Sequence, residues 1–239
     1  MTKIALVVPK KNDEIAEMKH FLAKENADIY VFPEGFLRHE YLQEALQIIK
    51  KYNKFVITGL KEQEAEIRYE TALIVDGGEV IGKYRKCILA KSEKEKGKLA
   101  GDEIHCMDTR FGKIGVPICY EIHFPEVARV MALENPVLLV NMIGTGMWHE
   151  QQYGQWTALA RARAIENEVF VVGCSHYTEG IPLTFAYSPK GELLAVAKGE
   201  HGCVCIEIDL EESMQKEHRY MEDRVPVCFE ALSRDIEGC

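Results

Sequence analysis

Short apolar runs alternate with amphipathic segments over the first sixty residues, and this alternation limits the fold more than any other feature. The runs at residues 4–8, 28–33 and 55–59 have the length and composition of buried strands. Between them, residues 13–26 and 41–52 place apolar side chains at helical spacing. This βαβαβ order predicts parallel strands joined by right-handed crossovers.

The pattern changes to hairpins after residue 70. Strand-like runs at 71–75 and 80–87 flank the turn Asp76-Gly77-Gly78-Glu79, and a second hairpin is expected from 104–108 and 113–118. Further strands are predicted at 136–142 and 169–174, a β-meander at 185–208, a helix at 155–167 and a surface loop at 92–101. Roughly ten to twelve strands exceed what one compact sheet usually carries. The predicted fold is therefore α/β, with two mixed sheets packed face to face and helices outside.

Composition narrows the class of protein. A chain of 239 residues that is 47% hydrophobic can fill one large core, so a single domain is expected. The net charge of −9 argues against nucleic acid or an anionic membrane as partner. The eight cysteines form no paired framework, and neither a secretory signal nor a membrane-spanning apolar run is visible. Reduced thiols in the cytoplasm fit this pattern best.

Residues 112–134 (GKIGVPICYEIHFPEVARVMALE) read as a strand, a sharp turn and a helix, with Cys119 at the corner. A thiol at a strand end and near a helix N-terminus is favoured as thiolate, which suits a nucleophile. The alternative interpretation is that Cys119 is a buried free cysteine that only fills the core.

Two other polar residues have the same kind of position. Glu34 follows the run DIYVFP, and Lys86 ends the run VIGKYR. Reactive side chains at the ends of buried strands can point into one crevice above the sheet. Taken singly, Glu34 could cap a helix and Lys86 could be a solvated strand end, so the coincidence of three such residues carries the argument.

The segments around these residues resemble a known family. FPEG at Glu34, GKYRKCIL at Lys86, ICYEIHFPE at Cys119 and RARAIENEVFVV at 161–172 are similar, in order and spacing, to segments of the nitrilase superfamily of carbon–nitrogen hydrolases. The resemblance covers about residues 3–209. It implies an α-β-β-α sandwich and a catalytic triad of Glu34, Lys86 and Cys119.

The implied chemistry is hydrolysis of a non-peptide C–N bond without a cofactor. Cys119 would attack the carbon and form a thioester, with Glu34 as general base and acid. Lys86 and the backbone N–H of Tyr120 would stabilise the oxyanion. The first choice of substrate is a small carboxamide, as in the omega-amidases, and the alternative is an N-carbamoyl amine or amino acid. The remaining hypotheses for the function are a nitrilase and a catalytically silent binding protein. A redox or metal protein would need CxxC pairs or clustered ligands, which the sequence lacks.

The resemblance also implies a second glutamate that orients the lysine. The family pattern places this glutamate a few residues before an apolar residue and a Gly-Asp pair. Leu99, Gly101 and Asp102 fit that pattern and point to Glu95. One residue is missing between the apolar position and the glycine, so Glu93 is the alternative. A solvated acid in a charged loop is the competing interpretation. Glu121 is expected to have a structural role, as a cap of the helix that begins near Phe124.

The loop at 144–154 (GTGMWHEQQYG) departs from the family pattern and is the candidate for substrate selection. The residues proposed to contact substrate are Thr145, Met147, Trp148, His149 and Glu150; the alternative is a surface or interface loop. No metal is expected, because His149-Glu150 lacks a second histidine one turn later and Cys203-x-Cys205 lacks two further ligands. Buried packing is the predicted role of that cysteine pair.

The resemblance further implies a homodimer or higher homo-oligomer. Residues 1–239 are predicted to form one hydrolase domain, and the irregular tail at about 210–239 is expected to lie at the dimer interface.

Overall fold

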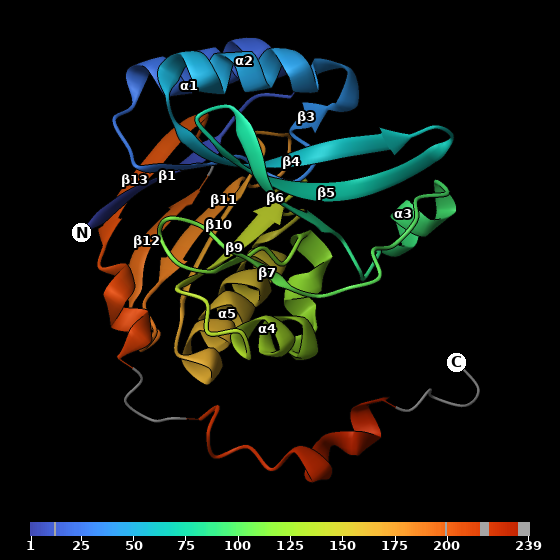
Figure 1. The fold of residues 1–239 in the computed structure, drawn as a ribbon, viewed down its shortest axis with the longest axis vertical. Coiled ribbons are helices and arrows are strands. Elements are labelled where there is room, and N and C mark those ends of the chain that lie inside the picture. The colour runs from blue at the N-terminus through green and yellow to red at the C-terminus, as the bar shows by residue number, and fades with distance from the viewer. Residues whose placement is uncertain (12, 199, 216–219, 234–239) are drawn as a thin grey trace.

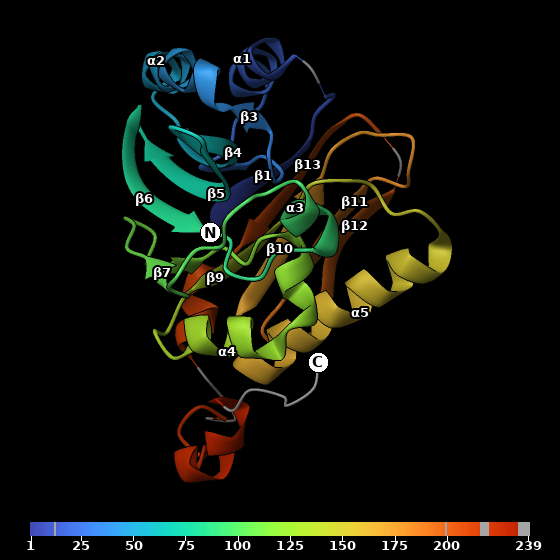
Figure 2. The same cartoon turned by 90° about the vertical axis from the view of Figure 1, so that its right-hand side faces the viewer.

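The computed structural model describes residues 1–11, 13–198, 200–215 and 220–233, and it arranges them in four layers (Figure 1). Two β-sheets pack face to face, and helices cover the outer face of each sheet, as the turned view in Figure 2 also shows. The predicted sandwich of two mixed sheets flanked by helices is confirmed.

The first sheet contains seven strands among the described residues, in the order β13-β1-β2-β4-β5-β6 with β3 beside β4. β1, β2 and β4 run parallel, as the βαβαβ pattern predicted, while β5, β6 and β13 add antiparallel pairs. The strands are β1 (Thr2–Val8), β2 (Ile29–Val31), β3 (Leu37–Arg38), β4 (Phe55–Glu64), β5 (Ile67–Asp76), β6 (Glu79–Arg85) and β13 (Gly202–Ile208).

The second sheet has six strands within the part of the chain that is described, in the order β12-β11-β10-β9-β8-β7. β8, β9 and β10 are parallel, and β7, β11 and β12 pair antiparallel at the two sides. The strands are β7 (Cys106–Met107), β8 (Ile114–Gly115), β9 (Leu138–Ile143), β10 (Phe170–Ser175), β11 (Leu183–Tyr187) and β12 (Leu193–Lys198).

The helices form the two outer layers. α1 (Glu14–Lys24) and α2 (Leu42–Tyr52) lie on the first sheet, while α4 (Pro125–Ala132) and α5 (Glu150–Asn167) lie on the second (Figures 1 and 2). The short α3 (Lys91–Glu95) stands beside the sandwich. The 3-10 helices are η1 (His39–Tyr41), η2 (Cys119–His123), η3 (Leu210–Met214) and η4 (Pro226–Ser233). Among the described helices, none is long and apolar enough to cross a lipid bilayer.

The sequence of β1 is apolar on both faces because the strand lies between two clusters of buried side chains. Ile4 and Leu6 belong to the large cluster between the sheets, whereas Ala5 and Val7 belong to the cluster under α1 and α2. All four side chains are fully buried. Successive side chains of a strand point to opposite faces, so a strand covered on both sides needs an uninterrupted apolar run.

Three sequence predictions are corrected by the structure. α5 begins at Glu150 rather than at residue 155, because His149 caps it by accepting the N–H of Gln152 at 3.1 Å. The segment predicted as a surface loop at 92–101 contains α3. The predicted meander is interrupted, because β13 leaves the second sheet and pairs with β1 in the first.

The cysteine pair on β13 is less enclosed than predicted. Cys205 is exposed and Cys203 is half-buried, and their sulfur atoms lie 3.9 Å apart. The buried packing expected for both is therefore wrong for Cys205, because β13 is an edge strand whose outer face is only partly covered.

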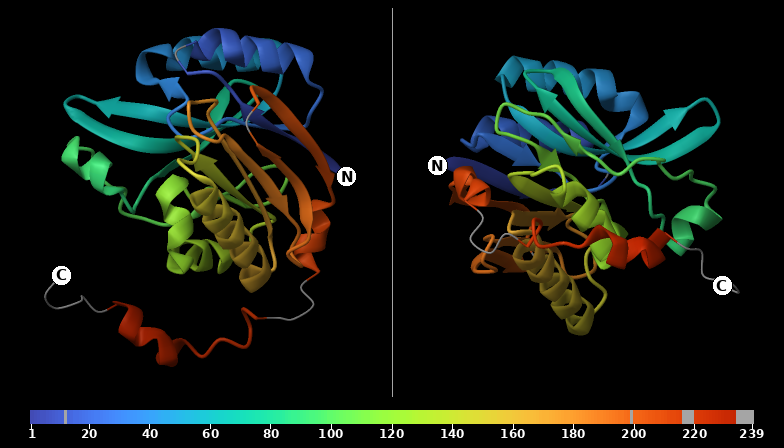
Figure 3. Two further views of the ribbon diagram at one scale, coloured as in Figure 1. Left: turned by 180° about the vertical axis from the view of Figure 1, so that it is seen from behind. Right: turned by 60° about the horizontal axis from the view of Figure 1, so that its bottom comes forward.

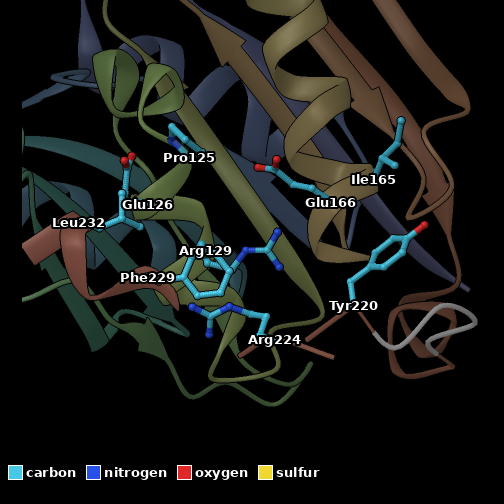
Figure 4. A pocket seen from close by; sticks show the side chains of 9 residues that line it. All are labelled: Pro125, Glu126, Arg129, Ile165, Glu166, Tyr220, Arg224, Phe229 and Leu232. Carbon is cyan, nitrogen blue, oxygen red and sulfur yellow. The ribbon is translucent and has the colours of Figure 1, made fainter. Parts of the chain in front are cut away.

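The tail after β13 leaves the sandwich and passes alongside the layer of α4 and α5 (Figure 3). The tail contacts this layer where Arg129 of α4 meets Met221, and beside that contact lies a cavity of about 690 Å³, lined by both helices and by the tail (Figure 4). Arg129 of α4 and Ile165 of α5 face Tyr220 and Phe229 across this space. The tail thus contributes little to the buried core, and its apolar side chains Val227 and Leu232 are each 66% exposed.

The ends of the parallel strands of both sheets meet on one side of the sandwich. A bridge between Lys10 and Tyr177 joins the segments that follow β1 and β10. The segment after β2 lies against β4 so closely that a Cβ on Gly59 would stand 2.4 Å from both the carbonyl oxygen of Pro33 and the nitrogen of Gly35. Only glycine leaves room for this backbone.

Gly59→Ala is expected to lower the free energy of unfolding by about 1–3 kcal/mol, because the added methyl must displace backbone rather than a flexible side chain. Gly154→Ala is the matched control: its Cβ would meet nothing within 4 Å and it lies inside α5. That change should raise the stability by up to about 1 kcal/mol. Urea unfolding of the two variants measures both, and equal effects would contradict the close approach at Gly59.

Candidate active site

The three residues singled out at strand ends meet in the structure. Glu34 follows β2, and Lys86 comes directly after β6. Cys119 follows Ile118, which forms a parallel bridge to Met142 of β9. The two sheets thus contribute to one site: the glutamate and lysine come from the first sheet and the cysteine from the second.

Lys86 is a buried cation between two carboxylates. Its side chain is 1% exposed, and Nζ lies 2.7 Å from Oε1 of Glu34 and 2.9 Å from Oε1 of Glu93. Burial opposes the charge, but the carboxylates of Glu34 and Glu93, with Cys119 nearby, raise the pKa of Lys86 above its usual range. Lys86 is therefore an ammonium ion at neutral pH.

Cys119 occupies a strained turn. Its φ is +48°, in the left-handed region that a side chain disfavours. The buried amide of Asn141 holds the turn, because its Nδ2 donates to the carbonyl oxygens of Pro117 at 2.9 Å and of Cys119 at 3.3 Å. The thiol interacts with the side chain of Glu34 and with the backbone of Gly144.

The Cys119 thiol is protonated at rest. Burial raises its pKa, the carboxylate of Glu34 raises it further, and the ammonium of Lys86 only partly opposes them. The sequence argument for a thiolate relied on the N-terminus of an α-helix, but Cys119 is the first residue of the short 3-10 helix η2, and α4 begins only at Pro125. A base is therefore needed to form a thiolate here, and the carboxylate of Glu34 interacts with the thiol.

Glu93, rather than Glu95, lies beside Lys86. Its Oε1 accepts from Lys86, and its Oε2 accepts the N–H of Ala90 at 2.7 Å, so one side chain fixes both the lysine and the start of α3. Glu95 is exposed and pairs loosely with Lys91 at 3.9 Å. Residues two apart on a helix point to different sides, which explains why only one of these glutamates reaches the site.

Glu121 has a structural position, but it does not cap α4. Its Oε1 accepts the hydroxyl of Tyr84 at 2.8 Å and the N–H groups of Cys87 at 2.8 Å and Ile88 at 3.1 Å. Its Oε2 accepts the N–H of Ile118 at 2.7 Å. This buried carboxylate therefore joins the segment after the lysine to the residue before the cysteine.

Two further residues that the sequence reasoning missed support Glu34. His176 directly follows β10, and its Nε2 lies 2.9 Å from the backbone oxygen of Glu34. Burial lowers the pKa of His176 to about 4, so a neutral imidazole donates this hydrogen bond. Gly144 follows β9, and a Cβ there would stand 2.3 Å from Oε2 of Glu34. Both occupy strand ends, so the rule that singled out Glu34 could have found them.

Glu70 is a second buried acid near the site. It lies on β5 and forms an ion pair with Lys98. Burial and then the charge of Glu34 raise the pKa of Glu70 to about 7. In the sequence, this buried acid could have been found as the one charged residue within the mostly apolar segment YETALIV.

The loop proposed to select substrate is shorter than predicted, and several of its residues have structural contacts. Met147 is buried, and its backbone pairs with Ile181. His149 caps α5, which begins at Glu150, and Trp148 is 75% exposed. The exposed Thr145 follows Gly144, which touches Glu34.

An ammonium paired with a carboxylate, and a thiol that interacts with the same carboxylate, are the kinds of group that acyl transfer through a covalent intermediate requires: a nucleophile, a base and a cation for a developing oxyanion.

Comparison with known proteins identifies the family. The family model described as carbon–nitrogen hydrolase matches residues 10–216. Since this match covers most of the chain, the protein belongs to the carbon–nitrogen hydrolase family, and it is an enzyme acting on C–N bonds other than peptide bonds. The predicted membership of the nitrilase superfamily is confirmed.

Individual relatives agree with this assignment. The chain is 31% identical over 195 residues to a probable nitrilase of Schizosaccharomyces pombe, a match that covers 76% of this chain and 70% of the relative. It is 30% identical over 253 residues to a 2-oxoglutaramate amidase of Bacillus subtilis, covering 95% and 94%. A carbon–nitrogen hydrolase from Helicobacter pylori G27 has the same fold, with a TM-score of 0.88 at 20% identity, covering 98% of this chain and 99% of that one.

Proposed function

We propose that the enzyme hydrolyses a small carboxamide to a carboxylate and ammonia through a thioester on Cys119. The observation that carries this proposal is the arrangement of the site, in which the Lys86 ammonium lies 2.7 Å from the Glu34 carboxylate and the Cys119 thiol interacts with the same carboxylate. Nucleophile, base and cation are thus within reach of one carbonyl group.

In the acylation step, Glu34 takes the thiol proton while the sulfur of Cys119 attacks the amide carbon. The tetrahedral oxyanion is stabilised by the ammonium of Lys86 and by the backbone N–H of Tyr120. The C–N bond then breaks, Glu34 returns the proton to the departing nitrogen, and ammonia leaves a thioester behind.

In the second step, Glu34 removes a proton from water, and the resulting hydroxide equivalent attacks the thioester carbon. The C–S bond breaks, Glu34 returns the proton to sulfur, and the product leaves as a carboxylic acid that loses its own proton to solvent and becomes the carboxylate. The same residue therefore acts as base and acid in both halves, which requires that its carboxylate stay free of saturating hydrogen bonds.

The choice of a carboxamide rests on the relatives. The 2-oxoglutaramate amidase, which aligns with almost the whole chain, is by its name an amidase. An N-carbamoyl amine or amino acid uses the same chemistry and is the alternative. A nitrile substrate is suggested by the name of the fission-yeast relative. A silent binding protein is disfavoured because a cysteine, a lysine and a glutamate in contact are all present.

We assign Glu93 the part of the second glutamate, in place of Glu95. Its contact with Lys86 at 2.9 Å supports a role in holding the ammonium toward the reacting carbonyl. The five residues Thr145, Met147, Trp148, His149 and Glu150 remain candidates for substrate contact, with Thr145 favoured because it adjoins Gly144.

We further propose a homodimer of single-domain protomers in which the tail at about 210–239 contributes to the interface. The exposed apolar side chains of Val227, Phe229 and Leu232 and the cavity behind the tail support this arrangement. A reducing, cytoplasmic location fits the seven described cysteines, all of which are free thiols.

Ammonia release from a panel of small amides, N-carbamoyl compounds and nitriles should reveal one active class. Cys119→Ser and Glu34→Gln are each expected to lower kcat/KM by at least about 10²-fold, because they remove the nucleophile or the base. Mass spectrometry of the wild-type enzyme should detect the acyl group on Cys119. Activity that survives Cys119→Ser would contradict the mechanism.

Glu93→Gln and Glu95→Gln form a matched pair on one short helix. Glu93→Gln should reduce kcat by about 10-fold or more, because a neutral amide holds the ammonium of Lys86 less well. Glu95→Gln should leave kcat and KM unchanged, since that side chain is 64% exposed. The reverse result would return the role of second glutamate to Glu95.

Phe229→Asp is expected to shift the protein from dimer to monomer, because a charge cannot be buried unpaired in an apolar interface. Sedimentation equilibrium measures the mass. Ile67→Asp is the control, since Ile67 is 39% exposed on β5, away from the tail. A mass unaffected by Phe229→Asp would remove the tail from the interface.

A further inference from the structure

Glu70 is a buried acid that the proposed mechanism does not use. It lies on β5 with only 4% of its surface exposed, and its Oε1 forms an ion pair with Nζ of Lys98. Its Oε2 is one of the buried side-chain atoms that have no hydrogen-bond partner within the described residues. A buried carboxylate oxygen without a partner costs free energy, which points to a role of this acid other than stability.

Glu70 lies between the segments that supply the two carboxylates of the site. A Cβ on Gly35, the residue after Glu34, would stand 3.3 Å from Oε2 of Glu70. The backbone oxygen of Glu70 accepts the N–H of Lys86 at 2.9 Å. On its other side, Glu70 binds Lys98, which follows α3. These contacts place Glu70 directly beside the candidate active site.

The segment after α3 is attached to the hairpin of β4 and β5 by backbone contacts as well as by this ion pair. The N–H of Leu99 donates to the carbonyl oxygen of Arg68 at 2.9 Å, and the guanidinium of Arg68 donates to the carbonyl oxygen of Lys96. The N–H of Lys98 donates to the carbonyl oxygen of Glu93 at 3.1 Å. Because Lys98 is hydrogen-bonded to Glu93, a displacement of Lys98 would displace Glu93 as well.

The charge of Glu70 changes near neutral pH. Charged residues of the neighbouring segments surround it: Lys61 opposite it on β4, Arg68 two residues earlier on β5, Glu34 after β2, Lys86 after β6 and Lys98 after α3. Burial raises the pKa of Glu70 to about 7, the charge of Glu34 adds to this effect, and the ammonium groups of Lys98 and Lys86 oppose it. The ion pair with Lys98 is therefore complete above about pH 7, and Glu70 becomes neutral as the pH falls below that value.

We propose that Glu70 is a positioning residue, whose ion pair with Lys98 keeps the segment after α3 in place so that Glu93 stays on the ammonium of Lys86. When Glu70 takes up a proton, a weaker neutral hydrogen bond replaces the ion pair and this segment loosens. This role rests on the proposed function, since it concerns how that site is held together. The enzyme should therefore lose activity as the pH falls through neutral, by a route separate from protonation of Glu34.

The first experiment compares kcat/KM of the wild type and of Glu70→Gln on a hydrolysed amide, between about pH 5.5 and about pH 8.5. Glutamine has the shape of protonated glutamate and cannot ionise. The wild type should exceed the variant about three- to tenfold at the upper pH, and the ratio should fall toward one at the lower pH. Groups that titrate in both enzymes largely cancel in this ratio. A ratio that is the same at every pH would overturn the inference.

Glu62→Gln is the matched control, because Glu62 is a second buried, ion-paired glutamate on the same hairpin. It lies on β4 and accepts hydrogen bonds from Arg85, Lys83 and Thr71. Burial opposes its charge, but these hydrogen bonds lower the pKa of Glu62 to about 2, so it stays ionised throughout the experiment. Any loss of activity in Glu62→Gln should therefore be the same at every pH.

A double variant tests whether Glu70 acts through Glu93. Glu70→Gln should lower kcat about three- to tenfold in the wild-type background but less than about twofold in Glu93→Gln, where the contact that it maintains is already weakened. Lys98→Met removes the other half of the ion pair and should reproduce the loss of Glu70→Gln at the upper pH, which also keeps the test available if Glu70→Gln does not fold. Losses that multiply in the double variant would show that Glu70 acts by another route and would overturn the inference.

Hydrogen exchange tests the same contact without a substrate. The N–H groups of Lys98 and Leu99, which are hydrogen-bonded in the structure, should exchange at least about threefold faster in Glu70→Gln than in the wild type at the upper pH, and at equal rates at the lower pH. The N–H groups of α5 should exchange equally in both proteins. Faster exchange without hydrolysis of any amide would retain the positioning role of Glu70 and reject the amidase. Hydrolysis with unchanged exchange and a constant activity ratio would do the opposite.

Discussion

The site depends on one buried charge, the ammonium of Lys86 between the carboxylates of Glu34 and Glu93. Leaving one member of such a pair without its partner costs about 3–5 kcal/mol, so the three segments that carry these groups are locked together. α3 has only five residues and could not be stable alone. Its glutamate, which binds both Lys86 and the helix start, orders it. The charge of Lys86 thus helps to hold the element that completes the site, together with the contacts of Lys98 and Leu99 just after α3.

Glu121 and Glu34 are both buried acids near Cys119, and the difference in their hydrogen bonds explains the different role of each. Glu121 receives four hydrogen bonds, from Tyr84 and from three backbone N–H groups, and both of its oxygens are used to hold neighbouring segments together. Glu34 is bound at one oxygen by Lys86, while its other oxygen faces Gly144. A carboxylate with an oxygen outside the ion pair can accept and return a proton, whereas a carboxylate that accepts backbone N–H groups at both oxygens is suited to holding backbone in place.

The sequence sufficed for features that depend on local pattern. The parallel strands at the N-terminus, the two sheets and the convergence of Glu34, Lys86 and Cys119 followed from apolar runs and from what stands at their ends. Reasoning from the sequence failed where the contacts of a single side chain determine the structure. The start of α5 depends on the cap by His149, and the choice between Glu93 and Glu95 depends on the direction of each side chain on α3. The protonated state of Cys119 depends on burial, which no spacing reveals.

The balance of charge around Lys86 also explains why the Cys119 thiol keeps its proton. If Cys119 were already a thiolate, the site would hold three negative groups against one buried ammonium. With the proton on sulfur, the charges are those of Glu34, Glu93 and Lys86 alone. Proton transfer from Cys119 to Glu34 moves one negative charge from oxygen to sulfur within reach of Lys86 and creates no new charge. A cation that is close to both the donor and the acceptor compensates the charge before and after transfer, so in the proposed mechanism the thiolate forms only when Glu34 can take the proton.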